Sequence, residues 1–259
     1  MASAAIERPE DADADERASE RAVREDLACA YRLVASMGWD DLIFTHLSAR
    51  VPGPEHHFLL NPYDRGFEEI TASSLVKVDM EGKPVDDPQV VVNPAGFTIH
   101  SAVHMAREDA RCVMHLHTLD GQAVSGMSEG LLPLNQTALG VVGDLAYHGY
   151  EGIALDHDER ERIVADLGDR NSMILRNHGT LTVGEEVGDA FLRMYFLERA
   201  CAIQVRTLAA GPENIARAPQ GTAEKVAQQN KGVAEYVSRQ LTWPMLRRRM
   251  DRLDASYKD

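Results

Sequence analysis

Residues 112–118 read Cys-Val-Met-His-Leu-His-Thr, a short and mostly apolar run that is typical of a buried strand. Side chains two positions apart on a strand point to the same face, so His115 and His117 are expected to share one face. Two imidazoles placed in this way can bind one metal ion at the bond length of about 2.0–2.1 Å that zinc requires. The alternative is a pair of ordinary strand histidines.

Helical and strand-like patterns alternate on both sides of this run, which predicts an α/β domain with a single mixed sheet. Apolar spacing and stop signals predict helices from Arg21 to the stop at Gly38, over residues 159–167 and over residues 187–208. A further helix is expected to follow Asn93-Pro94-Ala95-Gly96 and to end near Glu108, and residues 121–125 are expected to begin another. Strand-like runs occupy residues 43–50, 57–61, 76–79, 139–145, 153–155, 172–176 and 180–183.

A third metal ligand is expected from the segment Asn177-His178-Gly179, which lies between two apolar strands. We expect Gly179 to adopt a positive φ, because glycine does so without steric cost, and the turn would then present the imidazole of His178 outward from the sheet. Three histidine ligands with one open position describe a catalytic rather than a structural metal site.

Composition indicates a soluble protein, and we expect its partner to be a small-molecule substrate. The 259 residues carry a net charge of −14, which disfavours nucleic-acid and membrane partners. Three widely spaced cysteines, with neither a signal-like start nor a long apolar run, predict a cytoplasmic location. Residues 1–20, with seven acids against two arginines, are expected to form a mobile acidic tail.

We therefore divide the chain into this tail, a domain over residues 21–211 and a helical, polar C-terminal extension over residues 212–259. In the extension, Trp243 and Leu246 are candidates for docking onto the domain. Tyr236, Trp243 and Tyr257 either cap the site of a neighbouring subunit or belong to an undocked tail.

Three separated motifs resemble those of the class II aldolase/adducin family. They are Asn93-Pro94-Ala95-Gly96-Phe97-Thr98-Ile99-His100, His115-Leu116-His117-Thr118 and Arg176-Asn177-His178-Gly179. Residues 44–50, 69–75 and 147–152 also agree with the family. The motifs follow the family order at family-like separations from about Arg21 to Gly211, so the resemblance is specific.

The resemblance implies a three-layer αβα domain around a central, mainly antiparallel sheet. It also implies a homotetramer with the site at the subunit interface. Family members hold their metal with the two strand histidines and the later turn histidine, so His115, His117 and His178 are the expected ligands here. We expect one divalent transition metal per subunit, zinc first, with manganese, cobalt or iron as alternatives.

The chain departs from the pattern of the family's sugar-phosphate aldolases. Those enzymes carry an acid/base carboxylate four positions before the helix histidine that matches His100, and Gly96 stands there in this chain. Pro94 and Ala95 replace two serines that help bind the substrate phosphate, and His46 replaces an asparagine with the same task. The metal ligands are therefore retained, while the usual acid/base group is absent.

Histidine is the natural replacement for that carboxylate, because its pKa lies near neutral pH without tuning. The catalytic candidates are His46, His100, Tyr147, His148 and Glu151. An ordinary surface turn is the alternative for the segment that contains His148. For His100 the alternative is a helix residue at a packing seam or on a polar face, since His104 lies one turn further along.

These features predict an enzyme, a metal-dependent lyase that acts on a carbonyl or oxo-acid substrate through a metal-stabilised enolate. Aldol cleavage and decarboxylation both pass through an enolate, but only aldol cleavage needs a base to deprotonate a hydroxyl. Gly96 thus favours decarboxylation, or aldol cleavage of a non-phosphorylated substrate. Alternatives are a non-catalytic, adducin-like assembly or scaffold domain, and a dehydratase or epimerase that uses the same metal site.

Overall fold

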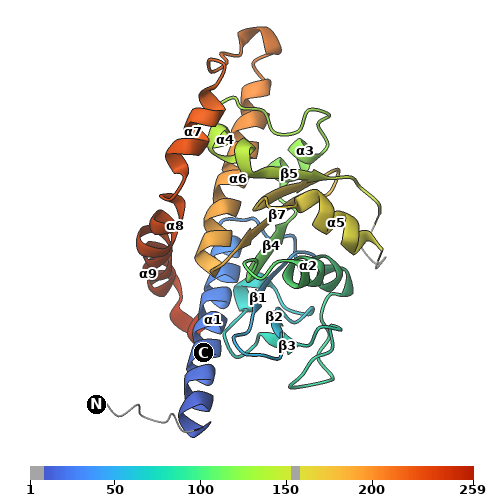
Figure 1. Cartoon of the computed structure of the whole chain (residues 1–259), viewed down its shortest axis with the longest axis vertical. Coiled ribbons are helices and arrows are strands. Elements are labelled where there is room, and N and C mark those ends of the chain that lie inside the picture. Colours follow the sequence, from blue (N-terminus) through green and yellow to red (C-terminus); the bar gives the residue numbers. More distant parts are fainter. Residues whose placement is uncertain (1–8, 153–157) are drawn as a thin grey trace, which may run out of the picture.

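The computed structural model describes residues 9–152 and 158–259, and its centre is one seven-stranded sheet (Figure 1). The strand order is β3-β2-β1-β4-β7-β6-β5. The strands are β1 (His46–Arg50), β2 (Phe58–Leu60), β3 (Val76–Val78), β4 (Cys112–Leu116), β5 (Leu145–His148), β6 (Ser172–Leu175) and β7 (Gly179–Gly184). Of the pairings between these strands, only that of β5 with β6 is parallel. The prediction of a mainly antiparallel sheet is confirmed.

Strand β4 is the middle strand of the sheet, and all five of its residues are buried. It pairs with β1 on one side, where His46 lies opposite His115, and with β7 on the other, where Thr180 lies opposite Leu116. A central position suits a short run of apolar residues, because both neighbours satisfy its backbone groups and both faces are covered.

Helices cover both faces of the sheet, which confirms the predicted αβα layers (Figure 1). On one face, α1 and α6 pack in a cluster in which Tyr31 and Phe191 meet Met114 of β4. On the other face, Val103 of α2 and Ile163 of α5 belong to a second cluster with sheet residues. The helices are α1 (Pro9–Ser36), α2 (Pro94–Ala106), α3 (Leu119–Ser125), α4 (Gln136–Val141), α5 (Glu159–Leu167), α6 (Val187–Leu208), α7 (Thr222–Asn230), α8 (Ala234–Tyr236) and α9 (Trp243–Leu253).

Helix α1 starts earlier than the composition predicted. We expected a mobile tail over residues 1–20, but the helix begins at Pro9, so that prediction is wrong for residues 9–20; residues 1–8 lie outside the described ranges. The acidic segment is also rich in alanine and glutamate, which are strong helix formers. Leu27 and Val34 anchor the same helix in the core, and extending an existing helix costs far less than starting one.

The predicted strand over residues 139–145 is largely wrong. That segment contains the end of α4 and a 3₁₀ turn over Val142–Asp144, and β5 starts only at Leu145. The side chain of Asn135 accepts a hydrogen bond from the backbone N–H of Ala138 and so caps a helix start. The predicted strand at residues 153–155 lies outside the described residues.

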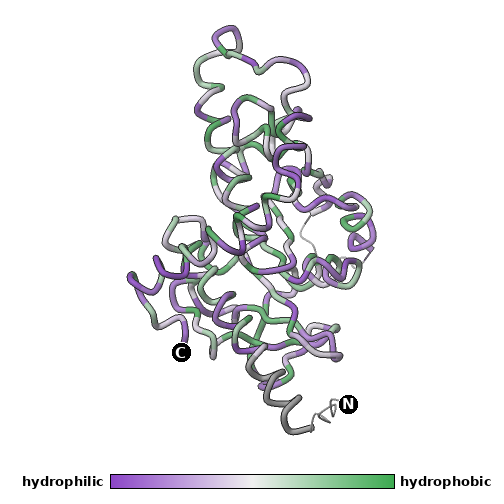
Figure 2. The backbone as a smooth tube through the Cα atoms, turned by 60° about the vertical axis from the view of Figure 1, so that its left-hand side comes forward, coloured by the Kyte–Doolittle hydropathy of each residue, from purple (hydrophilic) through white to green (hydrophobic). Residues whose placement is uncertain are grey.

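The C-terminal segment returns to the core. Trp243, Leu246 and Tyr257 are buried in the cluster that also contains α1 and α6, so Trp243 and Leu246 dock as predicted. Trp243 and Tyr257 therefore belong to the core of their own subunit, whereas Tyr236 is 59% exposed. Hydrophobic and hydrophilic stretches alternate along the whole backbone trace (Figure 2). Within the described residues, no helix has both the length and the apolar character that crossing a bilayer requires.

Candidate metal centre

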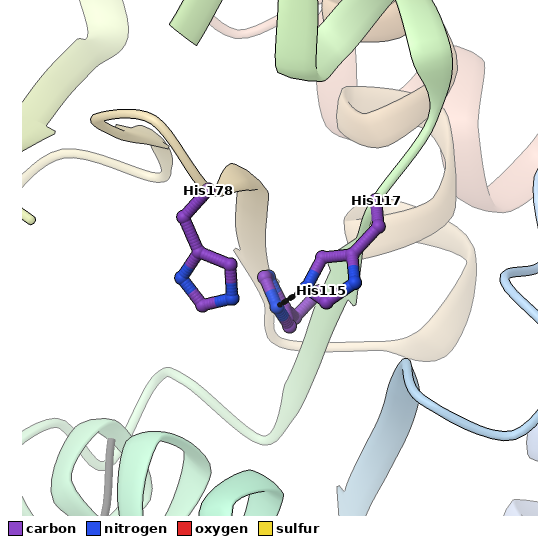
Figure 3. A group of neighbouring side chains, drawn as sticks. All are labelled: His115, His117 and His178. Carbon is purple, nitrogen blue, oxygen red and sulfur yellow. Dashed lines mark hydrogen bonds between the residues drawn. The ribbon is translucent and has the colours of Figure 1, made fainter. Parts of the chain in front are cut away.

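Two elements bring the three predicted histidines together. His115 lies on β4 and His117 immediately follows it, while His178 lies in the tight turn between β6 and β7. One nitrogen from each imidazole falls within 4.8 Å of the others. The side chains point toward a common centre (Figure 3), and the rings of His115 and His178 are 4.7 Å apart. The geometry is that of a three-histidine cluster that can hold a divalent metal.

The hydrogen bonds fix which nitrogens face this centre. Nδ1 of His115 donates to the backbone carbonyl of Thr180 at 2.9 Å, because a carbonyl can only accept. Nδ1 of His117 donates to a carboxylate oxygen of Asp41 at 3.1 Å. Both Nε2 atoms therefore face the centre, where they lie 2.9 Å apart. Two nitrogen lone pairs at this distance need a shared proton or a metal cation between them, so the donor set fits a metal ion.

The turn between β6 and β7 differs in detail from our expectation. The residue with a left-handed backbone is Asn177, with φ of 55°, and Gly179 is not among the residues with positive φ. Asparagine is one of the few residues that adopt this conformation readily. Gly179 is needed for space instead, because a Cβ there would collide with the carbonyl oxygen of Leu116 and come within 3.1 Å of the His117 ring.

Burial keeps His115 and His178 uncharged. Desolvation, reinforced by the neighbouring imidazoles, holds the pKa of His115 well below its usual value. The pKa of His178 falls to about 4, mainly through burial and secondarily through His117. Neutral imidazoles bind a metal without first releasing a proton. His115 is 1% exposed, whereas His117 and His178 are half-buried, so the centre is open to a small molecule on one side.

His46 fills the space beside Gly96. A Cβ at position 96 would lie 2.6 Å from the His46 ring, so a larger residue there and this placement of the imidazole exclude each other. The ring is 3% exposed, and its centroid is 5.4 Å from that of His115. Burial lowers its pKa to about 3.

His100 belongs to a buried chain of hydrogen bonds. Nδ1 of His104 donates to the carbonyl of Ala110 at 2.7 Å, so its Nε2 accepts from the Ser48 hydroxyl at 2.7 Å. The Ser48 oxygen then accepts from Nδ1 of His100 at 2.6 Å, which leaves Nε2 of His100 with a lone pair. That atom has no partner among the described residues. Its ring lies 4.2 Å from that of His46, so His100 faces the interior of the site rather than a polar helix surface.

Tyr147 is held away from the three histidines. Its hydroxyl accepts a hydrogen bond from the backbone N–H of Leu131, and the guanidinium of Arg176 lies 4.3 Å above its ring. It packs in an apolar cluster beneath α4 and α6. These contacts turn Tyr147 toward α4 and α6, and its catalytic role stays a prediction.

His148 and Glu151 both point toward α5. Nδ1 of His148 bonds to Asp166 at 2.7 Å, and Glu151 forms an ion pair with Arg162. His148 is buried, so the alternative of an ordinary surface turn does not describe it. The residue of this segment that approaches the metal centre is Tyr150, whose ring lies 6.2 Å from that of His178.

The residues that bond to the site histidines were not identified from the sequence. Asp41 and Thr180 bond to ligands, and Ser48 bonds to His100. No residue spacing in the sequence indicates these contacts. Glu198 accepts hydrogen bonds from the hydroxyls of Thr118 and Thr180, and its place in the sequence did give a signal of a special role. It is a carboxylate in the middle of the apolar face of a predicted helix, where burial without a partner is costly.

Known proteins are similar to this chain over the part that contains the three histidines. Positions 25–205 match the profile of the Class II Aldolase and Adducin N-terminal domain. The chain is 58% identical over 236 residues to a provisionally named class 2 aldolase of Caulobacter vibrioides, over 91% of each protein. It is 48% identical over 201 residues to mouse alpha-adducin, which amounts to 76% of this chain and 27% of adducin.

A solved structure agrees over the whole chain. L-fuculose 1-phosphate aldolase from Glaciozyma antarctica superimposes with a TM-score of 0.82 at 27% identity, over 100% of this chain and 97% of that one. The resemblance that the histidine motifs indicated is thereby confirmed, and the chain belongs to the class II aldolase and adducin family.

Proposed function

We propose that the chain is a metal-dependent carbon–carbon lyase that acts on a carbonyl or oxo-acid substrate. The observation that carries the proposal is the convergence of imidazole nitrogens from His115, His117 and His178, which lie within 4.8 Å of one another. Similarity over the full chain to a protein named as an L-fuculose 1-phosphate aldolase supports lyase chemistry.

A divalent ion bound by these three residues would polarise a carbonyl oxygen and offset the negative charge that develops there during bond cleavage. Zinc matches three neutral imidazoles best, and manganese, cobalt and iron are the alternatives. The second nitrogen of His115 is oriented by Thr180 and that of His117 by Asp41. These contacts hold both rings in the tautomer that presents Nε2 to the centre.

The chain's own residues favour a reaction that needs no strong base. The space that a side chain at position 96 would occupy is filled by His46, whose pKa is lowered by burial, so the ring is uncharged at neutral pH. A neutral imidazole can hydrogen-bond to a substrate oxygen, and the lone pair on Nε2 of His100 can accept from a substrate hydroxyl. Release of CO₂ needs no prior deprotonation. We therefore infer decarboxylation, or aldol cleavage of a substrate without phosphate.

Metal analysis followed by an activity screen tests this proposal. Purified protein should contain about one transition metal per chain, and a panel of 2-oxo and 3-oxo acids should include a substrate that releases CO₂ or an aldehyde. Chelation should abolish turnover and added zinc should restore it. Full lyase activity in metal-free protein would contradict the proposal. Release of CO₂ without an aldehyde identifies decarboxylation, and an aldehyde identifies aldol cleavage.

A non-catalytic assembly domain is the second candidate, because alpha-adducin is 48% identical over 201 residues. The cluster of three histidines argues against it, since an assembly surface has no use for converging imidazole lone pairs. The same metal analysis separates the two candidates. Protein without bound metal and without turnover on the panel would favour the assembly role. A dehydratase or epimerase would instead bind metal and convert its substrate without breaking a carbon–carbon bond.

We also propose a homotetramer with the metal centre at a subunit interface. Three large apolar side chains next to the centre are strongly exposed: Leu42 at 71%, Leu119 at 89% and Tyr150 at 56%. Leu42 follows the aspartate that binds His117, and Leu119 follows the residue after His117. Exposed apolar groups gathered around a site are typical of surfaces that another protein covers.

A further inference from the structure

A buried carboxylate lies behind the metal centre. Glu198 is on α6, is 3% exposed and sits among apolar neighbours that include Leu197 and Cys201. Its two oxygens accept hydrogen bonds from the hydroxyls of Thr118 and Thr180, one oxygen each. A hydroxyl that donates to a carboxylate forms a stronger hydrogen bond than one that donates to a neutral acceptor.

Each of these threonines is tied to a metal-ligating histidine. Thr118 directly follows His117 and caps α3 by accepting from the N–H of Gly121 at 3.0 Å. The backbone carbonyl of Thr180 accepts from Nδ1 of His115 at 2.9 Å, and Thr180 lies two residues after His178. One carboxylate therefore holds both chain segments that supply the three ligands.

The charge of Glu198 has no counterpart in the described protein. None of the described lysines, arginines or histidines forms an ion pair with it, and the nearby Asp120 and Cys201 supply no positive charge. Burial raises its pKa to about 7 despite the two threonine hydroxyls. A buried carboxylate without a cation is costly. Imidazole ligands carry no negative charge, so a divalent ion depends on nearby carboxylates to offset its charge, and Asp41 on His117 is one such carboxylate.

We propose that Glu198 is a positioning residue of the metal centre, which locks Thr118 and Thr180 in place and supplies negative charge to the bound dication. The inference rests on the metal centre of the proposed function but not on its lyase chemistry. Residues of this kind behind a metal site change its affinity by about 10–100-fold when they are altered.

The test is the zinc dissociation constant of metal-free protein, measured by competition with a chelating dye at pH 6, 7 and 8. Glu198→Gln keeps the shape of the side chain but removes its charge, so zinc binding should weaken by about 10–100-fold at pH 8. The ratio between the variant and the unaltered protein should shrink at pH 6, where Glu198 itself takes up a proton. Titration of the histidine ligands is common to both proteins and cancels in the ratio.

Asp189→Asn is the matched control, because Asp189 is a buried carboxylate on the same helix that pairs with Arg239 at 2.7 Å instead. It should leave zinc binding unchanged. Thr180→Val is the second variant, in case Glu198→Gln fails to fold. It removes one donor to Glu198 while keeping the carbonyl that His115 needs, and should weaken binding about fivefold, the value of one hydrogen bond.

Zinc binding by Glu198→Gln within about threefold of the unaltered protein at every pH would overturn the inference and leave the proposed lyase standing. If Glu198→Gln does not fold, unchanged zinc binding by Thr180→Val would overturn it in the same way. Failure of the unaltered protein to bind any transition metal would overturn both the inference and the proposed function. Weaker zinc binding by Glu198→Gln, in a protein that proves not to be a lyase, would support this inference and contradict the proposed function.

Discussion

The Nε2 atoms of His115 and His117 lie 2.9 Å apart, and the hydrogen bonds at their Nδ1 atoms orient both Nε2 atoms toward the centre. His178 completes the cluster from a separate turn, so its loss should leave the other two rings in place. We expect His178→Ala to weaken zinc binding by at least about 100-fold, because a two-histidine site is a far poorer ligand set than three. Chelator competition measures this change.

His57→Ala serves as the control for that prediction, because His57 precedes β2 and lies outside the cluster. It should bind zinc like the unaltered protein. Thermal unfolding of the metal-free forms checks that His178→Ala remains folded. Equal zinc affinity in all three proteins would show that the metal is held elsewhere.

Gly96 offers a test in which two effects oppose each other. Alanine is preferred over glycine inside a helix by about 1 kcal/mol, but its Cβ would lie 2.6 Å from the buried ring of His46. Overpacking of this kind costs about 1–3 kcal/mol. We expect the clash to dominate, so Gly96→Ala should lower the free energy of unfolding in urea and displace His46, which would reduce turnover while zinc remains bound.

Gly149→Ala is the matched control, since a Cβ at position 149 meets nothing within 4 Å. Its free energy of unfolding should stay within about 0.5 kcal/mol of the unaltered protein. A more stable Gly96→Ala protein with full turnover would show that His46 moves aside freely and has no part in the reaction.

At the residue scale, spacing alone placed His115 and His117 on one face of a strand, and the family motifs added His178. Nothing in the local sequence indicated that Asp41 or Ser48 would bond to the site histidines, because those contacts join segments far apart in the chain. Residue spacing shows which side chains share an element. It does not show which distant element lies opposite them.

At the scale of elements, α6 links the sheet to the metal centre through Glu198. The pKa of this residue is about 7 in the metal-free fold, against 4.5 for an ordinary glutamate, mainly because of burial. A raised pKa means that the folded state binds the proton more tightly than the unfolded chain. This stabilisation is present below pH 4.5 and is lost as the pH rises to about 7, and its size is about 3 kcal/mol.

The prediction is measured as a difference between two metal-free proteins. The free energy of unfolding of the unaltered protein, minus that of Glu198→Gln, should fall by about 3 kcal/mol between pH 4.5 and pH 8. Other titrating groups affect both proteins equally and cancel. A difference that does not change with pH would mean that Glu198 titrates normally in the fold.

The boundaries of an element were predictable where its apolar residues follow a single helical spacing. Helices α5 and α6 begin and end at the predicted residues, since each has an apolar face at helical spacing and a stop signal. The strand prediction for residues 139–145 was wrong because a short apolar run fits a strand or a helix equally well. The cap at Asn135, outside that run, decides the outcome.

At the scale of the whole molecule, the layers and the mainly antiparallel sheet followed from the family resemblance. The strand order β3-β2-β1-β4-β7-β6-β5 could not be read from the alternation of elements, because pairing depends on long-range contacts. The docking of the C-terminal segment was only partly predictable. A tryptophan in a polar segment predicts that Trp243 is buried. It does not predict against what, because its partners on α1 and α6 are more than 30 residues away in sequence.

The exposed apolar residues around the metal centre lead to a prediction about assembly. Leu119 is 89% exposed immediately beyond the ligand segment, and a charge there would be buried unpaired if a second subunit covers the centre. Leu119→Glu should therefore convert the expected tetramer to smaller species, as measured by light scattering after size-exclusion chromatography. Leu253→Glu alters a leucine that is 59% exposed on α9 and should leave the mass unchanged. A monomeric unaltered protein at micromolar concentration would refute the assembly, and the exposed side chains would then be free to contact the substrate.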